Sequence, residues 1–324
     1  MRRTIRSYVL LVVLLFLGLI LSLLLGRYAL SLEKILDRSS MDRRIFLQLR
    51  LGRSLMVLLT GICLGISGSV FQTVLRNPLA APDVTGVASG ASTGAAIAIL
   101  LTGRVGMVTS LSAFLGGVLA VSIALLLTFL SRRRDTATLL LAGIVTNALF
   151  QAVLMLLKLS ADTERTLASI EFWLMGSFAD MTTDRFLQTL PYALSGLLGL
   201  FLIHRPVQML HLADDEAKML GVNVPLIRAL ALLFATLSTS AVISRTGLIS
   251  FVGLLAPHAA RILCRGERSS MALSAIAGGV LLLYADLLAR MVGPYEIPVS
   301  IITSLIGAPV LFLLFAGKGG ERHA

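Results

Sequence analysis

Long apolar stretches separated by short polar segments dominate the pattern of this chain. A membrane-spanning helix needs roughly 20 mostly apolar residues, and ten stretches approach that length. The alternation of apolar and polar residues that is typical of membrane β-strands is absent. We therefore expect an all-α integral membrane protein with about ten transmembrane helices. The predicted spans are 8–26, 54–74, 84–102, 107–130, 137–158, 186–204, 226–244, 247–263, 273–290 and 299–316.

Composition supports this class. The 324 residues are 56% hydrophobic and only 14% charged, with a mean hydropathy of +0.91, which is too apolar for an ordinary soluble domain. We expect a single transmembrane domain over 1–324. The net charge of +11 could suggest a nucleic-acid partner, but in a membrane protein such charge sets orientation and contacts lipid headgroups. We expect the lipid bilayer, and no nucleic acid, as a partner.

Charged residues beside the spans predict the orientation. Arg2, Arg3 and Arg6 precede the first span, and no small-residue cleavage site follows it, so we expect an uncleaved helix with a cytoplasmic start. Ten spans then leave both termini in the cytoplasm. The segment 27–53 would be external yet carries seven Lys or Arg residues. Docking of an acidic partner would explain this exception, and ordinary solvated charge is the alternative.

The segment 71–94, FQTVLRNPLAAPDVTGVASGASTG, predicts a break between two membrane helices. Pro78 and Pro82 lack a backbone donor and interrupt a helix. Such a break survives in a bilayer only where protein or a water-filled cavity satisfies the freed backbone groups. Glycines at every fourth position from Gly86 let a neighbouring helix approach closely. This pattern favours a pathway or gate.

The same segment closely resembles the signature of permease subunits of ATP-binding-cassette (ABC) importers for vitamin B12, haem and iron-siderophores, the FecCD-type permeases. Further resemblance lies in EFWLMGSF, in Asp215–Val222 and in TGLISFVGLLAPHAARIL. It implies the type II ABC importer permease fold in a prokaryotic inner membrane. It also implies a homodimer, two ATPase subunits and an external substrate-binding protein. We expect Trp173 of the second element to anchor the chain at the membrane interface.

The resemblance implies where the gate and pathway lie. Asn77 and Leu79 match positions of the family's cytoplasmic gate, and capping of the broken helix by Asn77 is an alternative or additional role. Thr146, Asn147 and Gln151 share one face of the fifth span. Uncharged polar groups at membrane depth need partners, which either a hydrated pathway or a neighbouring helix can supply.

Three arginines match docking positions of the family. Arg50 and Arg53 lie in QLRLGRSL, which resembles an R-L-P-R element with Gly52 in place of the proline. Arg290 matches a further external arginine. An intrachain pair with Asp286, one turn earlier, is the alternative for Arg290.

The polar segment of about 205–225 predicts two short helices on the cytoplasmic face. Acidic residues at the start of the second complement the helix dipole, and Gly221 can end it. The resemblance implies that this segment couples the chain to the ATPase, and a solvated connector is the alternative. The expected coupling residues are Asp214, Asp215, Glu216, Leu220 and Gly221.

Energy must come from another polypeptide, because the sequence has no G-x-x-x-x-G-K-[ST] phosphate loop. We expect ATP and Mg²⁺ on the partner ATPase, and in this chain no cofactor, no metal and no catalytic residue. His258 lacks ligand partners at metal spacing, so a structural role is favoured. The expected cargo is an iron-siderophore or haem, with cobalamin as the alternative.

Two other classes fit less well. An ion-coupled secondary transporter would need titratable residues near the middle of the bilayer, which are scarce here. An intramembrane enzyme would need a paired nucleophile and base or a metal cluster.

Overall fold

The computed structural model describes residues 2–26, 28, 31–37, 39–83, 85–132, 135–162, 165–264, 270–292 and 295–316. Within these ranges the regular elements are all helices, so the predicted all-α fold is confirmed. The chain termini that were expected in the cytoplasm, Met1 and 317–324, lie outside the described residues. In chain order the helices are α1 (Arg2–Leu24), α2 (Leu32–Leu36), α3 (Met41–Arg44), η1 (Ile45–Arg50, a π-helix), α4 (Leu51–Val74), α5 (Val87–Thr102), α6 (Met107–Leu130), α7 (Thr136–Leu159), α8 (Thr166–Leu174), α9 (Thr183–Leu202), α10 (His204–Met209), α11 (Asp214–Met219), α12 (Val224–Thr246), α13 (Val252–Cys264), α14 (Met271–Met291) and α15 (Val299–Ala316).

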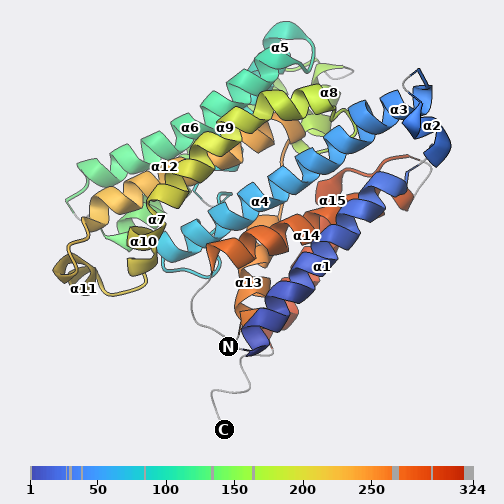
Figure 1. Cartoon of the computed structure of the whole chain (residues 1–324). Helices are drawn as coiled ribbons and strands as arrows, with labels where there is room; N and C mark the ends of the chain where they lie inside the picture. Colours follow the sequence, from blue (N-terminus) through green and yellow to red (C-terminus); the bar gives the residue numbers. More distant parts are fainter. Residues whose placement is uncertain are drawn as a thin grey trace.

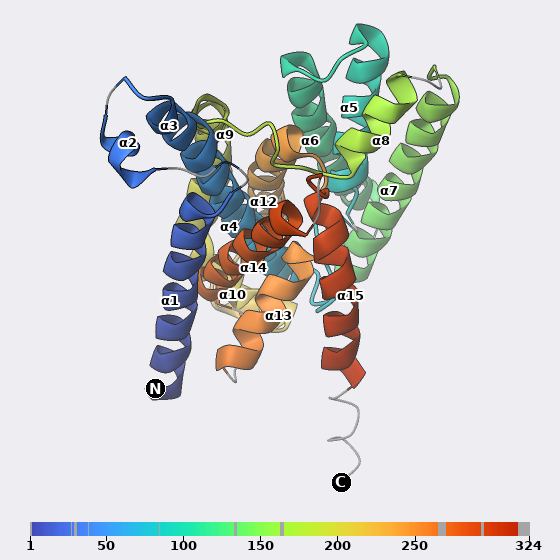
Figure 2. The same cartoon turned by 90° about the vertical axis from the view of Figure 1, so that its right-hand side faces the viewer.

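The long helices run between two ends of the molecule. The short helices α2, α3 and α8 lie at one end, and α10 and α11 lie at the other (Figures 1 and 2). We call these the α3 end and the α11 end. The start of α1 lies toward the α11 end, where Ser7 Oγ donates to Leu263 O at 2.7 Å.

Each predicted span coincides with a helix. Six helical segments are long and apolar enough to cross a membrane by length and composition, and three shorter apolar helices cover 87–102, 252–263 and 299–313. The remaining predicted span corresponds to α9. Its first turn is polar because it contains Thr183, Asp184 and Arg185, and Thr182 caps it by accepting from Arg185 N at 3.3 Å.

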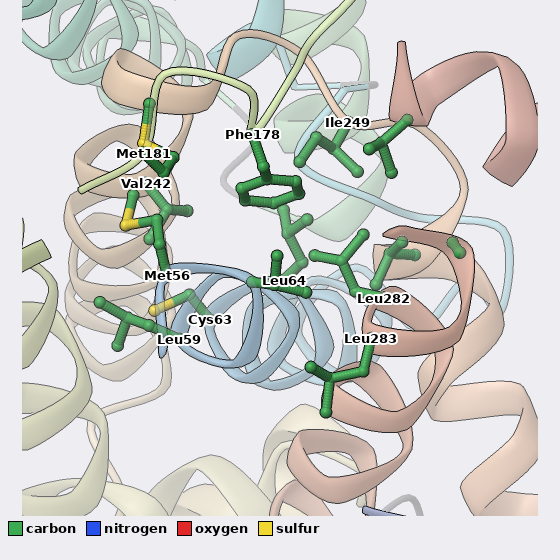
Figure 3. Close-up of a cluster of buried hydrophobic side chains, with 14 of the residues drawn as sticks. Met56, Leu59, Cys63, Leu64, Phe178, Met181, Val242, Ile249, Leu282 and Leu283 are labelled. Carbon is green, nitrogen blue, oxygen red and sulfur yellow. The ribbon is translucent and has the colours of Figure 1, made fainter. Parts of the chain in front are cut away.

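Helix α4 is the centre of the bundle. Its apolar side chains meet residues of α12, α14 and the loop after α8 in one buried cluster (Figure 3). Members of this cluster that Figure 3 labels are Met56, Leu59, Cys63, Leu64, Phe178, Met181, Val242, Ile249, Leu282 and Leu283. The cluster fixes the position of α4 and therefore of the loop that follows it.

Glycines set the spacing of the helices, as predicted for 71–94. A Cβ atom on Gly94 would lie 2.1 Å from Ser112 O of α6, so α5 and α6 touch through backbone atoms. The same contact joins α4 to α14, where a Cβ atom on Gly61 would lie 2.4 Å from Gly278 O. Close backbone approach of this kind is how small residues pack membrane helices.

The helical run that contains α4 begins earlier than predicted. The predicted span starts at residue 54 and leaves 27–53 as a loop, whereas α3, η1 and α4 form one run from Met41. Ser40 caps this run by accepting from Arg43 N at 3.2 Å, and 41–51 contains neither Gly nor Pro. The extension places Arg50 and Arg53 on one continuous helix.

Candidate gate, coupling and docking sites

The loop between α4 and α5 carries the predicted gate residues. Asn77 Oδ1 accepts from Leu79 N at 2.9 Å, and Asn77 N donates to Gln72 O at 3.2 Å. The Asn77 side chain therefore shapes the loop itself, while the end of α4 is closed by backbone bonds. Leu79 is 47% exposed, so the loop presents an apolar residue on the surface.

The predicted pathway helix α7 lies directly beside this loop. A Cβ atom on Gly86 would lie 3.3 Å from Asn147 N, and one on Gly143 would lie 3.1 Å from Thr85 Cα. Thr146 is fully buried, and its hydroxyl donates to Ala142 O at 2.8 Å. The structure thus brings the predicted gate loop and pathway helix together.

The two amides of α7 differ from Thr146 in exposure. Asn147 is half-buried and Gln151 is exposed on this single chain. A primary amide that faces hydrocarbon leaves its hydrogen-bonding groups unsatisfied at a cost of several kcal/mol. This placement favours a surface that meets water or a protein partner over one that meets lipid.

The predicted pair of short helices at the α11 end is confirmed as α10 and α11. Glu216 Oε2 accepts from Ala213 N at 3.3 Å and closes the start of α11. Gly221 ends this segment with φ of +83°, and its N–H donates to Lys218 O at 2.8 Å. Asp215 and Leu220 are exposed, so the segment presents acidic and apolar groups on the surface.

Asp214 differs from its acidic neighbours because it faces the bundle. Arg76 Nη2 lies 2.6 Å from Asp214 Oδ1, and Arg228 Nη2 lies 2.7 Å from the same oxygen. Burial raises the pKa of Asp214, but the hydrogen bonds and charges of Arg228 and Arg76 outweigh it and hold the pKa below its ordinary value. Neither arginine was predicted as a partner, because nothing in their spacing points to a carboxylate 14 or 138 residues away.

The three predicted docking arginines meet at the α3 end. Arg50, Arg53 and Arg290 line one cavity of about 200 Å³ together with Tyr28 and Glu296. Each arginine is less than a tenth exposed. This burial was not predictable from the sequence, because it depends on how α1, α4 and α14 pack together.

Carboxylates and backbone carbonyls hold these arginines. Arg53 Nη2 lies 2.8 Å from Asp286 Oδ1, and its Nη1 lies 2.9 Å from Glu296 Oε2. The alternative pair for Arg290 is present, with Nε 3.1 Å from Asp286 Oδ2. Arg50 Nη1 donates to Leu23 O at 2.9 Å. Electrostatic interactions within the chain therefore set the geometry of this cavity.

Two other predictions concern single side chains. Trp173 is 7% exposed and packs with Ile170 and Ile243, so the prediction of an interface anchor is wrong. The reason is that α8 turns the face carrying Trp173 toward the bundle.

His258 lies in α13 and contacts residues of its own helix: its Nδ1 lies 3.0 Å from Leu254 O and 3.0 Å from Arg261 Nη2. Among the described residues, no three His, Cys, Asp or Glu side chains are grouped to hold a metal ion.

Comparison with known proteins places the chain in a family. Residues 13–316 match the model of the FecCD transport family. The molybdate import system permease protein MolB of Haemophilus influenzae is 35% identical and covers 94% of this chain and 93% of its own length. The ferric enterobactin transport system permease protein FepG of Escherichia coli is 36% identical over 84% of this chain and 82% of its own length.

A relative with a third cargo and a solved structure agree with this match. The cobalamin import system permease protein BtuC of Halobacterium salinarum is 36% identical over 85% of this chain and 74% of its own length. A solved structure described as an inward-facing conformation of an ABC transporter of the metal-chelate type has a TM-score of 0.85 and 34% identity. It covers 95% of this chain and 97% of that one. The chain therefore belongs to the FecCD transport family.

Proposed function

We propose that this chain is the membrane-spanning permease subunit of an ABC importer and forms the translocation pathway for a metal chelate. The observation that carries the proposal is the arrangement of the bundle. An exposed helical segment, α10 and α11, lies at one end, and an arginine-lined cavity lies at the other. The gate loop after α4 and the polar face of α7 lie side by side in the bundle.

The energy source is assigned to a partner. The chain has no phosphate loop, so a separate ATPase supplies ATP hydrolysis with its own Mg²⁺. The exposed residues Asp215 and Glu216 of α11, with Leu220 directly after it, fit a surface that contacts that ATPase. The proposed assembly contains two permease chains and two ATPases. Rocking of the helix bundles alternates access across the interface between the two permease chains.

The α3 end is proposed as the docking face for an external binding protein. Arg50, Arg53 and Arg290 give the cavity there a positive lining, which complements acidic side chains. With this face external, the α11 end and both chain termini lie in the cytoplasm of a prokaryote.

The cargo is proposed from the relatives and the pathway. Relatives carry names for ferric enterobactin, hemin, cobalamin and molybdate. An iron-siderophore or haem is our proposal, with cobalamin as the alternative. Asn147 and Gln151, which the structure leaves half-buried and exposed, are uncharged, so selection among chelates is assigned to the binding protein.

Reconstituted transport tests the proposal. Proteoliposomes would contain this chain with its cognate ATPase and binding protein. Uptake of labelled iron-siderophore, haem, cobalamin and molybdate would be compared with and without ATP. ATP-dependent accumulation of a chelate is expected. Accumulation driven by an ion gradient without ATP would instead identify a secondary transporter, and ATP-dependent uptake of molybdate alone would overturn the chelate assignment.

A further inference from the structure

One carboxylate ties three separate parts of the chain together at the α11 end. Asp214 begins α11, Arg76 lies in the loop after α4, and Arg228 lies in the second turn of α12. Arg228 binds both carboxylate oxygens, with Nη1 to Oδ2 at 3.0 Å and Nη2 to Oδ1 at 2.7 Å. Arg76 Nη2 reaches Oδ1 at 2.6 Å. Two-point binding of this kind fixes orientation as well as distance.

Arg76 also holds the connection between α10 and α11. Its Nε donates to Leu210 O at 3.1 Å, and its Nη2 donates to Leu212 O. The Arg76 guanidinium therefore binds both the backbone before α11 and the side chain of Asp214, the first residue of α11. If this segment is displaced, the Arg76 side chain must move with it, or its charge-assisted hydrogen bonds break.

The backbone conformation of Arg76 connects these side-chain contacts to the gate residues Asn77 and Leu79. Arg76 has φ of +48°, a left-handed conformation that is uncommon for a residue with a side chain. It directly precedes Asn77, whose side chain accepts from Leu79 N at 2.9 Å. The left-handed residue and this side-chain bond make one tight turn between the arginine and Leu79.

The two arginine contacts of Asp214 differ in how deeply they are buried. The Arg228 side chain is 5% exposed, whereas those of Arg76 and Asp214 are 34% and 33% exposed. The Arg228 contact anchors α11 to α12. The Arg76 contact lies nearer the solvent, and the further hydrogen bonds of Arg76 to Leu210 O and Leu212 O join the loop after α4 to this unit.

The neighbouring acids do not share this role. Asp215 pairs with Lys218 within α11 at 3.0 Å and its side chain is 92% exposed. Glu216 closes the start of α11 through Ala213 N. The control is therefore taken from elsewhere: Asp184, in the first turn of α9, is an exposed acid outside the proposed ATPase surface.

We infer that Arg76 is a positioning residue that transmits displacement of α11 to the gate loop through its contact with Asp214. The inference rests on the proposed function, in which an ATPase moves α11. Because the turn from Arg76 to Leu79 is short and internally bonded, movement of the guanidinium carries the gate residues with it.

The test measures gate movement and ATP hydrolysis on the same complex. Leu79→Cys would be introduced in a chain with Cys63 and Cys264 changed to Ala. Spin labels on the two permease copies then report the distance across the gate in liposomes containing the ATPase, with and without Mg²⁺-ATP. In the unchanged background the distance is expected to shift with nucleotide.

Arg76→Gln and Asp214→Asn are expected to lose most of that shift while at least half of the ATP hydrolysis remains. The double variant should lose no more than Asp214→Asn alone, because that change already removes the Arg76 contact together with the Arg228 contact. Asp184→Asn and the conservative Asp214→Glu should retain the shift. A full shift in Arg76→Gln would overturn the inference, and so would a loss in Asp184→Asn as large as in Asp214→Asn. Absence of hydrolysis and of any shift in the unchanged complex would contradict the proposed function itself.

Discussion

Arg53 and Asp286 form a buried ion pair between helices, although they are 233 residues apart in the sequence. Arg53 Nη2 lies 2.8 Å from Asp286 Oδ1, and the Asp286 side chain is fully buried. The other oxygen of Asp286 lies 3.1 Å from Arg290 Nε. One carboxylate therefore holds two of the three arginines that line the cavity at the α3 end.

Removing this carboxylate should destabilise the bundle. Asp286→Asn leaves two guanidinium groups, 10% and 8% exposed, without their shared buried partner. Breaking a buried ion pair from one side costs about 3–5 kcal/mol. Thermal unfolding of the detergent-solubilised chain, followed by the fluorescence of Trp173, measures this loss. Asp180 is exposed, so Asp180→Asn serves as the control. Equal unfolding temperatures for Asp286→Asn and Asp180→Asn would contradict the expectation.

Glu296 should compete with an acidic docking partner. It binds Arg53 Nη1 at 2.9 Å, and its side chain is 30% exposed, so it already supplies a negative charge to the cavity. Glu296→Gln should tighten partner binding by about 1 kcal/mol, the value for one nearby unit charge in water.

Binding of the purified binding protein to the chain in nanodiscs, measured at low and high salt, tests this charge effect. The gain in Glu296→Gln should shrink at high salt because ions screen such contacts. Glu33→Gln, an exposed acid at the same end, is the control. A gain of equal size in Glu33→Gln would show a general charge effect instead of competition inside the cavity.

Close backbone contact between α4 and α14 should make Gly61 intolerant of a side chain. A Cβ atom there would lie 2.4 Å from Gly278 O and 2.7 Å from Gly278 C, and these backbone atoms cannot rotate away. Gly61→Ala should destabilise the protein by about 3 kcal/mol, at the upper part of the range for overpacked sites. Gly106→Ala meets nothing within 4 Å and should lower the unfolding temperature far less. Similar stability of both variants would refute this packing.

Sequence patterns predicted the membrane spans well because each span depends on the composition of its own residues. The apolar runs and the glycine spacing specify α5 and α6 without knowledge of any distant residue. The two short helices before α12 follow in the same way from Asp214 and Gly221. All of these features are encoded within about ten neighbouring residues.

Features that depend on distant contacts were not predictable from the sequence alone. Burial of Trp173 depends on how α8 turns against α5 and α12, which its helical spacing does not encode. Likewise, Arg53 meets Asp286 only because α4 packs against α14. The pairing of Arg76 with Asp214 joins residues 138 positions apart. Electrostatic partners of this kind are fixed by tertiary packing.

Acid should release α11 from the bundle. The folded pKa of Asp214 lies below its ordinary value because Arg228 and Arg76 outweigh the effect of burial. The stabilisation is therefore complete above the ordinary pKa of about 4 and is lost as the pH falls through the lower folded value. Hydrogen exchange of 210–222, corrected for intrinsic rates, should increase below about pH 4. Asp214→Asn should show fast exchange at every pH, and the same acid response in both proteins would exclude Asp214 as its source.

Backbone strain at Gly221 should uncouple hydrolysis from transport. Gly221 has φ of +83°, and proline is restricted to φ of about −65°. Gly221→Pro also removes the N–H that donates to Lys218 O at 2.8 Å, so the end of α11 cannot form. Transport and ATP hydrolysis measured on the same proteoliposomes give the uptake per ATP hydrolysed, which should fall at least tenfold.

Gly103 is a matched control for this backbone effect at the α3 end. It has φ of +68°, and its N–H donates to Ile99 O at 2.8 Å. A Cβ atom on either glycine would have no neighbouring atom within 4 Å, so both proline substitutions act through the backbone alone. Because Gly103 lies far from α11, Gly103→Pro should change the uptake per ATP little. Equal loss in both variants would mean that general backbone strain, and not the end of α11, determines coupling.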